Sequence, residues 1–141
     1  MTSPFGKILC AVDFDDLCDV ALETATRLLP SDGVLYVLHA ARFPYALTDE
    51  EAALPLSSAK ERLDEMVRKL LSADRFEILV ERNDDAARSI LKRARRLAID
   101  CIVIPTHARK GLDHLLLGSV AEKVVRQAPC RVVTVRPPLA G

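Results

Sequence analysis

Apolar residues along the chain fall into short continuous runs, separated by longer stretches in which they recur every three or four positions. Five of the runs have the length of a β-strand, and they cover residues 7–13, 33–40, 75–81, 100–105 and 131–136. Continuous apolarity is typical of strands that are covered on both faces, as in a parallel sheet. The third run alternates between apolar and polar residues instead, which predicts a more exposed strand near an edge of the sheet.

Four helices are predicted between these strands, because the intervening apolar residues follow the helical period. Acidic residues or capping boxes are expected to satisfy the first backbone N–H groups of each helix. In chain order these start signals are Asp15-Asp16, the box Ser58–Glu61, Asp84-Asp85 and the box Ser119–Glu122. The fourth helix is expected to stop before Pro129.

The alternation of strands and helices predicts a doubly wound α/β fold, in which a five-stranded parallel sheet has helices on both faces. The length of 141 residues favours a single domain, residues 1–141. Residues 41–55 and 106–117 follow neither period and are predicted to be irregular. Because such folds bind ligands beyond the carboxyl ends of their strands, we expect a ligand near the second stretch, which follows the fourth strand.

Charge and cysteine content narrow the function classes. Twenty basic residues balance twenty acidic ones, so nothing draws the whole chain to nucleic acid or to an anionic membrane, and self-association meets little repulsion. No apolar run is long enough for a membrane span and the first residues do not resemble a signal peptide, which favours the cytoplasm. The four cysteines form no CxxC pair, and we expect Cys10 and Cys101, which lie in apolar runs, to be buried.

Asp13 is the first candidate binding residue, because it stands at the end of the first strand. A carboxylate in that position accepts ribose hydroxyls, holds a metal or caps the next turn. Asp13, Asp15 and Asp16 also match the acidic cluster of phosphoacceptor receiver domains. That interpretation requires an Asp at the end of the third strand and a Lys at the end of the fifth. Val80-Glu81-Arg82 and Arg136-Pro137 stand there instead, so the sequence disfavours it.

The start of the fourth helix is the second candidate. Its first backbone N–H groups have no partner within the helix and, with the positive end of the helix dipole, form an anion site. Gly118 and Ser119 stand there, and Arg109 and Lys110 add positive charge nearby. Alternatively, Ser119 and Glu122 satisfy these groups as a capping box, and no ligand is needed.

The remaining candidates favour structural roles. His39 ends a strand and is expected to satisfy a backbone group, whereas His107 and His114 have no third ligand at metal spacing. The basic run at 92–96 is interpreted as a solvated helix face, with contact to an acidic partner as the alternative. No spacing or motif of nucleophilic, metalloprotease or P-loop chemistry occurs, so we do not expect an enzyme.

The chain resembles the universal stress protein family over essentially its whole length, and most specifically in its last third. The matching segments are 8–14, 38–40, 102–112, 115–125 and 129–137. The resemblance implies strand order 3-2-1-4-5, with the reversal of winding between the first and fourth strands. It also implies a homodimer in which the fifth strands, Arg131 to Arg136, pair antiparallel.

The fifth strand itself supports such pairing. In this order it is an edge strand, whose unpaired backbone groups invite a partner. Residues 132–135 are β-branched and uncharged, so the edge lacks the usual defences against pairing. The alternative is a monomer whose edge is covered by residues 137–141.

One branch of the family binds ATP through a glycine motif, which this chain carries in degenerate form. Pro105 and Ala108 replace the first two glycines of the motif. Proline lacks a backbone donor, and the Cβ of alanine crowds the phosphate and resists positive φ. The positions that the resemblance implies for a nucleotide are Asp13, Val37, Arg109, Gly118, Ser119 and Val120.

The sequence therefore favours a dimeric, non-catalytic stress-response module that binds ATP weakly or not at all. The alternative is a stress sensor that binds ATP or AMP with magnesium, the nucleotide lying where the winding reverses between the first and fourth strands.

Overall fold

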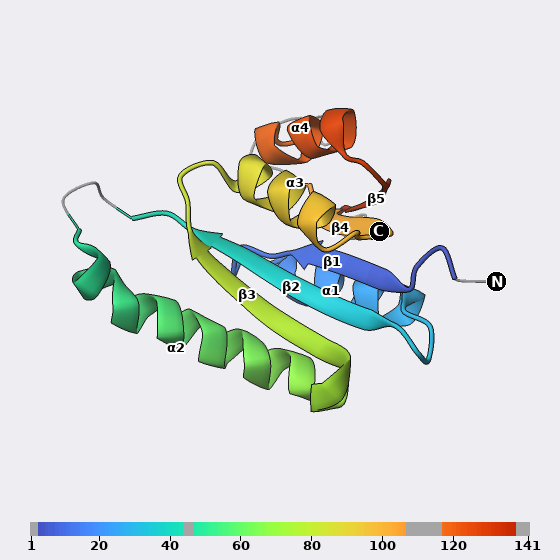
Figure 1. Cartoon of the computed structure of the whole chain (residues 1–141), viewed down its shortest axis with the longest axis horizontal. Coiled ribbons are helices and arrows are strands. Elements are labelled where there is room, and N and C mark those ends of the chain that lie inside the picture. The colour runs from blue at the N-terminus through green and yellow to red at the C-terminus, as the bar shows by residue number, and fades with distance from the viewer. Residues whose placement is uncertain (1–2, 44–46, 107–116, 138–141) are drawn as a thin grey trace.

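Five parallel strands form one sheet in the order β3-β2-β1-β4-β5 within residues 3–43, 47–106 and 117–137, the part of the chain that the computed structural model describes (Figure 1). The strands are β1 (Lys7–Ala11), β2 (Val34–Ala41), β3 (Phe76–Arg82), β4 (Cys101–Pro105) and β5 (Arg131–Val135). The order confirms the predicted doubly wound sheet. It also confirms that the alternating run, β3, lies at an edge.

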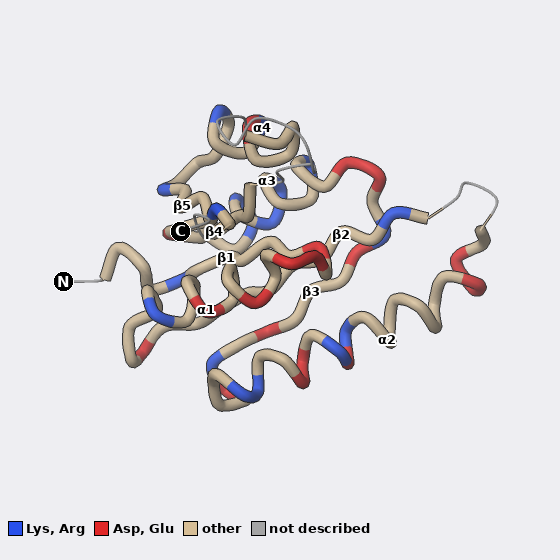
Figure 2. The backbone as a smooth tube through the Cα atoms, turned by 180° about the vertical axis from the view of Figure 1, so that it is seen from behind, with Lys and Arg blue, Asp and Glu red and all other residues tan. Residues whose placement is uncertain are grey.

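Helices cover both faces of the sheet. They are α1 (Cys18–Leu28), α2 (Asp49–Arg68), α3 (Ala86–Arg96) and α4 (Ser119–Gln127), and a 3-10 turn (Ala73–Arg75) precedes β3. The helices α1 and α2 pack on one face, around a core that includes Ile8 and Cys10 of β1. The helices α3 and α4 pack on the other face, where Leu9 of β1 and Ile102 of β4 are fully buried. Figure 2, from the opposite side, brings α1 in front of the sheet.

This two-sided packing explains the continuous apolar runs of the sequence. Successive side chains of a strand point to opposite faces, so a strand covered on both sides needs apolar residues at every position. Apart from the exposed Lys7 at the start of β1, the inner strands β1 and β4 are apolar and buried. None of the described helices combines the length and the apolarity needed to cross a membrane.

The start of α2 differs from its prediction. The helix begins at Asp49 rather than at Ser58, so residues 49–55, nearly half of the stretch predicted to be irregular, are helical. Thr48 accepts a hydrogen bond from the backbone N–H of Glu51, and Glu51 accepts one from Thr48, which makes a capping box. Pro55, the last residue of that stretch, lies within the helix, at the loss of one backbone hydrogen bond.

Two further helix starts correct the sequence analysis. Asp15 does not cap α1; its carboxylate accepts from the N–H of Leu17 at 3.0 Å, in the turn before the helix. The capping box predicted at Ser119 is absent, because Gly118 is the N-cap residue and Glu122 pairs with Arg126. The predicted cap of α3 is confirmed, since Asp85 accepts from the N–H of Arg88 at 3.0 Å.

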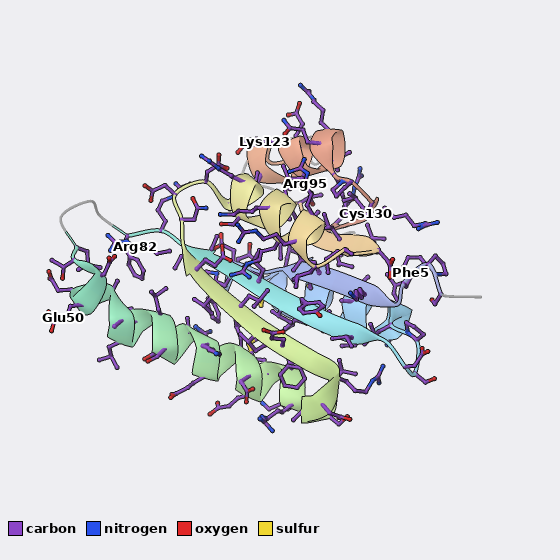
Figure 3. All side chains as sticks on the ribbon, viewed as in Figure 1. Phe5, Glu50, Arg82, Arg95, Lys123 and Cys130 are labelled. Carbon is purple, nitrogen blue, oxygen red and sulfur yellow. The ribbon has the colours of Figure 1, made fainter. Side chains whose placement is uncertain are left out.

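Arg82, at the end of β3, fixes the beginning of α2 beside the carboxyl ends of the strands. Its guanidinium donates to the carbonyl of Leu47 at 2.6 Å and to the carboxylate of Asp49 at 3.1 Å. It also lies over the ring of Phe43. Figure 3 labels Arg82 close to the connection that leads into α2. Phe43 and the start of α2 are thereby held next to the site described below.

Candidate functional site

A pocket of about 920 Å³ opens at the carboxyl ends of β1 and β4, where the winding of the sheet reverses. The ladder between these two strands ends at the pair Cys10 and Val103, so the last residues of both strands separate and line the pocket. This is the position that a doubly wound sheet offers to a ligand.

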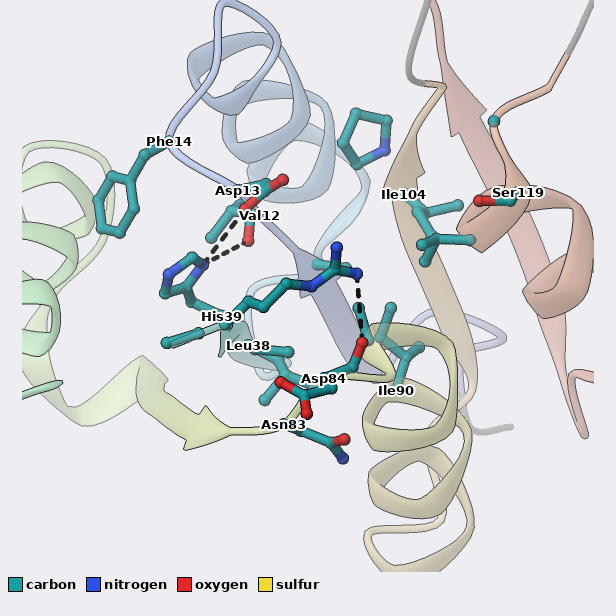
Figure 4. A pocket seen from close by; sticks show the side chains of 18 of the residues that line it. Val12, Asp13, Phe14, Leu38, His39, Asn83, Asp84, Ile90, Ile104 and Ser119 are labelled. Atoms are coloured by element: carbon teal, nitrogen blue, oxygen red, sulfur yellow. Dashed lines mark hydrogen bonds and ion pairs between the residues drawn. The ribbon is translucent and has the colours of Figure 1, made fainter. Parts of the chain in front are cut away.

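The pocket has an apolar floor and a polar rim. Leu38, Ile90 and Ile104 form part of the floor (Figure 4). The polar side chains at the rim belong to Asp13, His39, Arg42, Asn83, Asp84 and Ser119. Apolar area with a few convergent polar groups is typical of small-molecule sites.

The turn after β1 presents Asp13 to the pocket. His39 lies 3.0 Å from the carbonyl of Val12 through Nδ1, so Nδ1 carries a hydrogen and donates it to that carbonyl. The same nitrogen is 3.9 Å from the carboxylate of Asp13, whose side chain is 61% exposed. The structure confirms that His39 satisfies a backbone group, and Figure 4 shows both contacts.

Phe14 follows Asp13 with a φ of 47°, a left-handed conformation that costs energy in a residue with a side chain. Its ring meets that of His39 edge to face at 4.8 Å, and the guanidinium of Arg62 from α2 lies 4.5 Å from its centre. These two contacts hold the strained turn in one conformation. The carboxylate of Asp13 is therefore kept at the rim of the pocket.

The start of α4 forms the opposite side of the pocket. Gly118 has no side chain with which to cap the helix, and Ser119 is exposed and makes no capping hydrogen bond. Its first backbone N–H groups are thus available to an anion at the positive end of the helix dipole. Because Ser119 and Glu122 do not form the predicted capping box, they do not satisfy these N–H groups, and a ligand can do so instead.

A phosphate held by the start of α4 would also need a backbone donor from the end of β4. Pro105 is the residue that stands there. Thr106 donates its backbone N–H to the carbonyl of Val135 at 2.8 Å, so Thr106 faces β5. Because successive residues of a strand face opposite neighbours, the nitrogen of Pro105 faces β1 and the pocket. That nitrogen carries no hydrogen, so Pro105 offers the pocket no backbone donor.

Four of the six predicted nucleotide positions meet at the pocket: Asp13, Gly118, Ser119 and Val120. Val37 does not, because its side chain is fully buried in the core and it pairs with Ile78 in the β2–β3 ladder. The residues of β2 that line the pocket are 38–41, nearer the end of the strand. Arg109 lies outside the described residues.

The other residues of the glycine-motif region are also outside the described part of the chain, namely Ala108, Lys110, His107 and His114. Three lining residues were missed by the sequence analysis: Arg42, Asn83 and Asp84. Arg42 donates to the backbone carbonyl of Asp84 at 3.2 Å, which links the ends of β2 and β3. Their signal was their position directly after a strand, as for Asp13.

Two of the polar side chains at the pocket are engaged in hydrogen bonds within the fold. Within the described residues, no three His, Cys, Asp or Glu side chains are grouped to hold a metal. Asn83 is engaged with Ser89 at 2.6 Å, and Nδ1 of His39 is engaged with a carbonyl. The arrangement offers hydrogen bonds, an anion site and an apolar surface.

Comparison with known proteins gives one consistent result. Residues 4–136 match the model of the universal stress protein family. Universal stress protein A homolog 2 of Coxiella burnetii is 31% identical over 143 residues, which covers 94% of this chain and 95% of that protein.

Two solved structures share the fold. A universal stress protein in complex with cAMP has a TM-score of 0.73 at 17% identity, covering 95% of this chain and 98% of that one. The universal stress protein of Archaeoglobus fulgidus in complex with dAMP has a TM-score of 0.63 at 24% identity, covering 94% and 98%.

Proposed function

Because this chain belongs to the universal stress protein family, we propose that it is a non-catalytic stress-response module that binds adenine nucleotides weakly in the pocket between β1 and β4. We propose further that it acts as a homodimer through β5. The observation that carries the nucleotide proposal is the pairing of an uncapped helix start at Gly118 with a donor-free Pro105 in the same pocket.

The pocket supports nucleotide binding by its chemistry. The apolar floor of Leu38, Ile90 and Ile104 suits the faces of a purine, and the carboxylate of Asp13 suits the hydroxyls of a ribose. The first N–H groups of α4 suit a phosphate. The complexes of related folds with cAMP and dAMP agree with a ligand that carries one phosphate.

Pro105 supports weak rather than tight binding. A phosphate at this edge finds no backbone donor at Pro105, and the alanine at position 108 replaces a second glycine of the ATP motif. A strained glycine position filled by alanine costs about 1–2 kcal/mol. We therefore expect a dissociation constant for ATP above roughly 100 μM.

Calorimetric titration with ATP and with AMP, each with and without magnesium, tests this proposal. The expected result is weak heat with both nucleotides and no turnover of ATP during prolonged incubation. Sub-micromolar binding of ATP would overturn it and would favour the second candidate, a nucleotide-dependent stress sensor. The uncapped start of α4 is the observation that supports that candidate.

Pro105 weakens binding in two ways, because it lacks a backbone donor and restricts the backbone conformation. Two substitutions at this position separate these effects. Pro105→Gly restores both the backbone donor and the conformational freedom of the motif, and it should tighten AMP and ATP binding by about tenfold. The matched control Pro105→Ala restores the donor alone and should recover only part of the gain. Unchanged affinity in both variants, with unchanged thermal stability, would mean that Pro105 does not limit binding.

The cytoplasm is the location that we propose. All four cysteines are free thiols, and Cys10, Cys18 and Cys101 are buried. Proteins of reducing compartments characteristically lack disulfides.

A further inference from the structure

The two faces of the sheet differ in charge, although the formal net charge of the chain is zero. The helices α1 and α2 together carry eight carboxylates against four cations. The helices α3 and α4 carry seven cations against one carboxylate. Figure 2 shows the acidic residues along α1, the turn before it and α2, and a group of basic residues around α3.

The basic face is built around cations that make no ion pair in the described part of the chain, although the charge of Asp85 at the helix start reaches Arg88. Arg88, Lys92, Arg95 and Arg96 of α3 are exposed, and none of them makes an ion pair within 4 Å in the described part of the chain. The fifth cation of the helix, Arg93, pairs with Glu81 and is half-buried. We call the four unpaired cations the α3 basic stripe.

The fold itself does not require the α3 basic stripe. The helix dipole favours cations in the last turn, which accounts for Arg95 and Arg96. It does not account for Arg88, which lies near the positive end of the helix, or for Lys92, which lies before the last turn. Like charges four residues apart, as in Arg88–Lys92 and Lys92–Arg96, weaken a helix. A row that weakens its own helix points to a partner outside the chain.

The opposite face has the complementary pattern. Asp16, Glu50, Glu61 and Glu65 are exposed and also make no ion pair among the described residues. In α2, Arg62 is engaged with Phe14 and Arg68 with Asp64, so Lys60 is the one described cation of the helix without such a contact. Glu61 and Glu65 repeat the four-residue step of the α3 basic stripe, about 6 Å along a helix axis.

We propose that copies of this chain associate through their opposite faces. The α3 basic stripe of one copy lies against the acidic side chains on the α1 and α2 face of another, centred on Glu61 and Glu65. A second copy is the occupant that the charges support, because the chain carries both complementary surfaces and a net charge of zero that sets up no general repulsion. The contact joins two different surfaces, so it extends into rings or longer assemblies rather than closing as a dimer.

Light scattering of the full chain at low and high salt tests this association. At about 10 mM salt, where charges act over about 30 Å, the average mass should rise with protein concentration to at least about twice its high-salt value. Above about 0.3 M salt, where screening acts within 10 Å, the mass should return to a constant value. The proposed pairing of β5 rests on backbone hydrogen bonds, which salt affects little, so the high-salt mass measures that pairing separately.

Charge reversal identifies the surfaces. Arg88→Glu with Lys92→Glu should abolish the low-salt increase, and Glu61→Lys with Glu65→Lys should do the same. All four positions are exposed, and thermal unfolding controls for an intact fold. An equimolar mixture of the two reversed proteins should associate again, because each now offers the face that the other lacks.

Three results would overturn the proposal. One is a wild-type mass that does not change between low and high salt at about 100 μM, a concentration at which even weak contacts form. Another is an association that survives reversal of either surface. The third is tight binding of a short fluorescent oligonucleotide, lost with Arg88→Glu and Lys92→Glu, by a protein that does not self-associate. That result would assign the basic stripe to nucleic acid instead.

Discussion

The thiols of this chain lie in surroundings that disfavour the thiolate. Burial raises the pKa of Cys18 and of Cys101 to about 11, and it raises the pKa of the fully buried Cys10 further. Burial also raises the pKa of Cys130, which is only partly covered. Since the thiolate is the reactive form, these residues behave as small apolar side chains.

A thiol reagent should therefore distinguish the cysteines. In the native protein near pH 8, Cys130 should react slowly and Cys10, Cys18 and Cys101 should be protected. All four should react at once in denaturant. Mass spectrometry of labelled peptides measures this, and fast native labelling of Cys10 or Cys101 would contradict the burial of these thiols.

At the scale of single residues, the sequence predicted side chains at strand ends better than side chains within strands. Asp13 follows β1 and His39 lies near the end of β2, where position alone brings them to the pocket. Val37 was assigned through a resemblance, and its place within β2 turns its side chain into the core. The strain at Phe14 depends on tertiary contacts with His39 and Arg62, which no local pattern records.

At the scale of elements, strand periods and apolar faces were predicted well, whereas of the four helix starts only that of α3 was predicted correctly. A capping box is a short pattern that occurs by chance, as at Ser58 and Ser119. The box that forms, at Thr48, lies in the stretch that was predicted to be irregular, and Pro55 follows it within the same helix. Competition between caps is decided by packing: Arg82 binds the segment before α2 and so selects the earlier start.

The edge strand β5 permits a direct test of the proposed dimer. The carbonyl of Val135 accepts from Thr106 of the β4 side, so Val133, two residues earlier, also faces β4. Thr134 then directs its backbone groups outward. Thr134→Pro should weaken the dimer by removing a donor from the free edge, while the ladder to β4 remains.

Sedimentation equilibrium on wild type, Thr134→Pro and the control Thr134→Ala measures this effect in high salt. Val133→Pro serves as the opposite control, since it removes a donor to β4 and should lower the melting temperature instead. A wild-type protein that is monomeric at tens of micromolar would contradict the dimer. A Thr134→Pro variant as dimeric as wild type would place the contact elsewhere.

At the scale of the whole molecule, alternation along the chain predicts a parallel sheet but not the order of its strands. Right-handed crossovers allow several orders, and 3-2-1-4-5 came from the family resemblance. The alternating β3 at one edge was the one independent sign. The charge difference between the two faces was invisible in the composition, because opposite charges cancel in the net sum and separate only when the helices take their sides.

In the function proposed here, the pocket between β1 and β4 receives a nucleotide weakly, with its phosphate at the start of α4. Titration of isotope-labelled protein with millimolar AMP, followed by amide resonances, tests this directly. We predict fast exchange with a dissociation constant above roughly 100 μM, and the largest shifts at Gly118, Ser119, Val120 and Asp13. Slow exchange, or shifts that leave the amides of α4 unmoved, would contradict it.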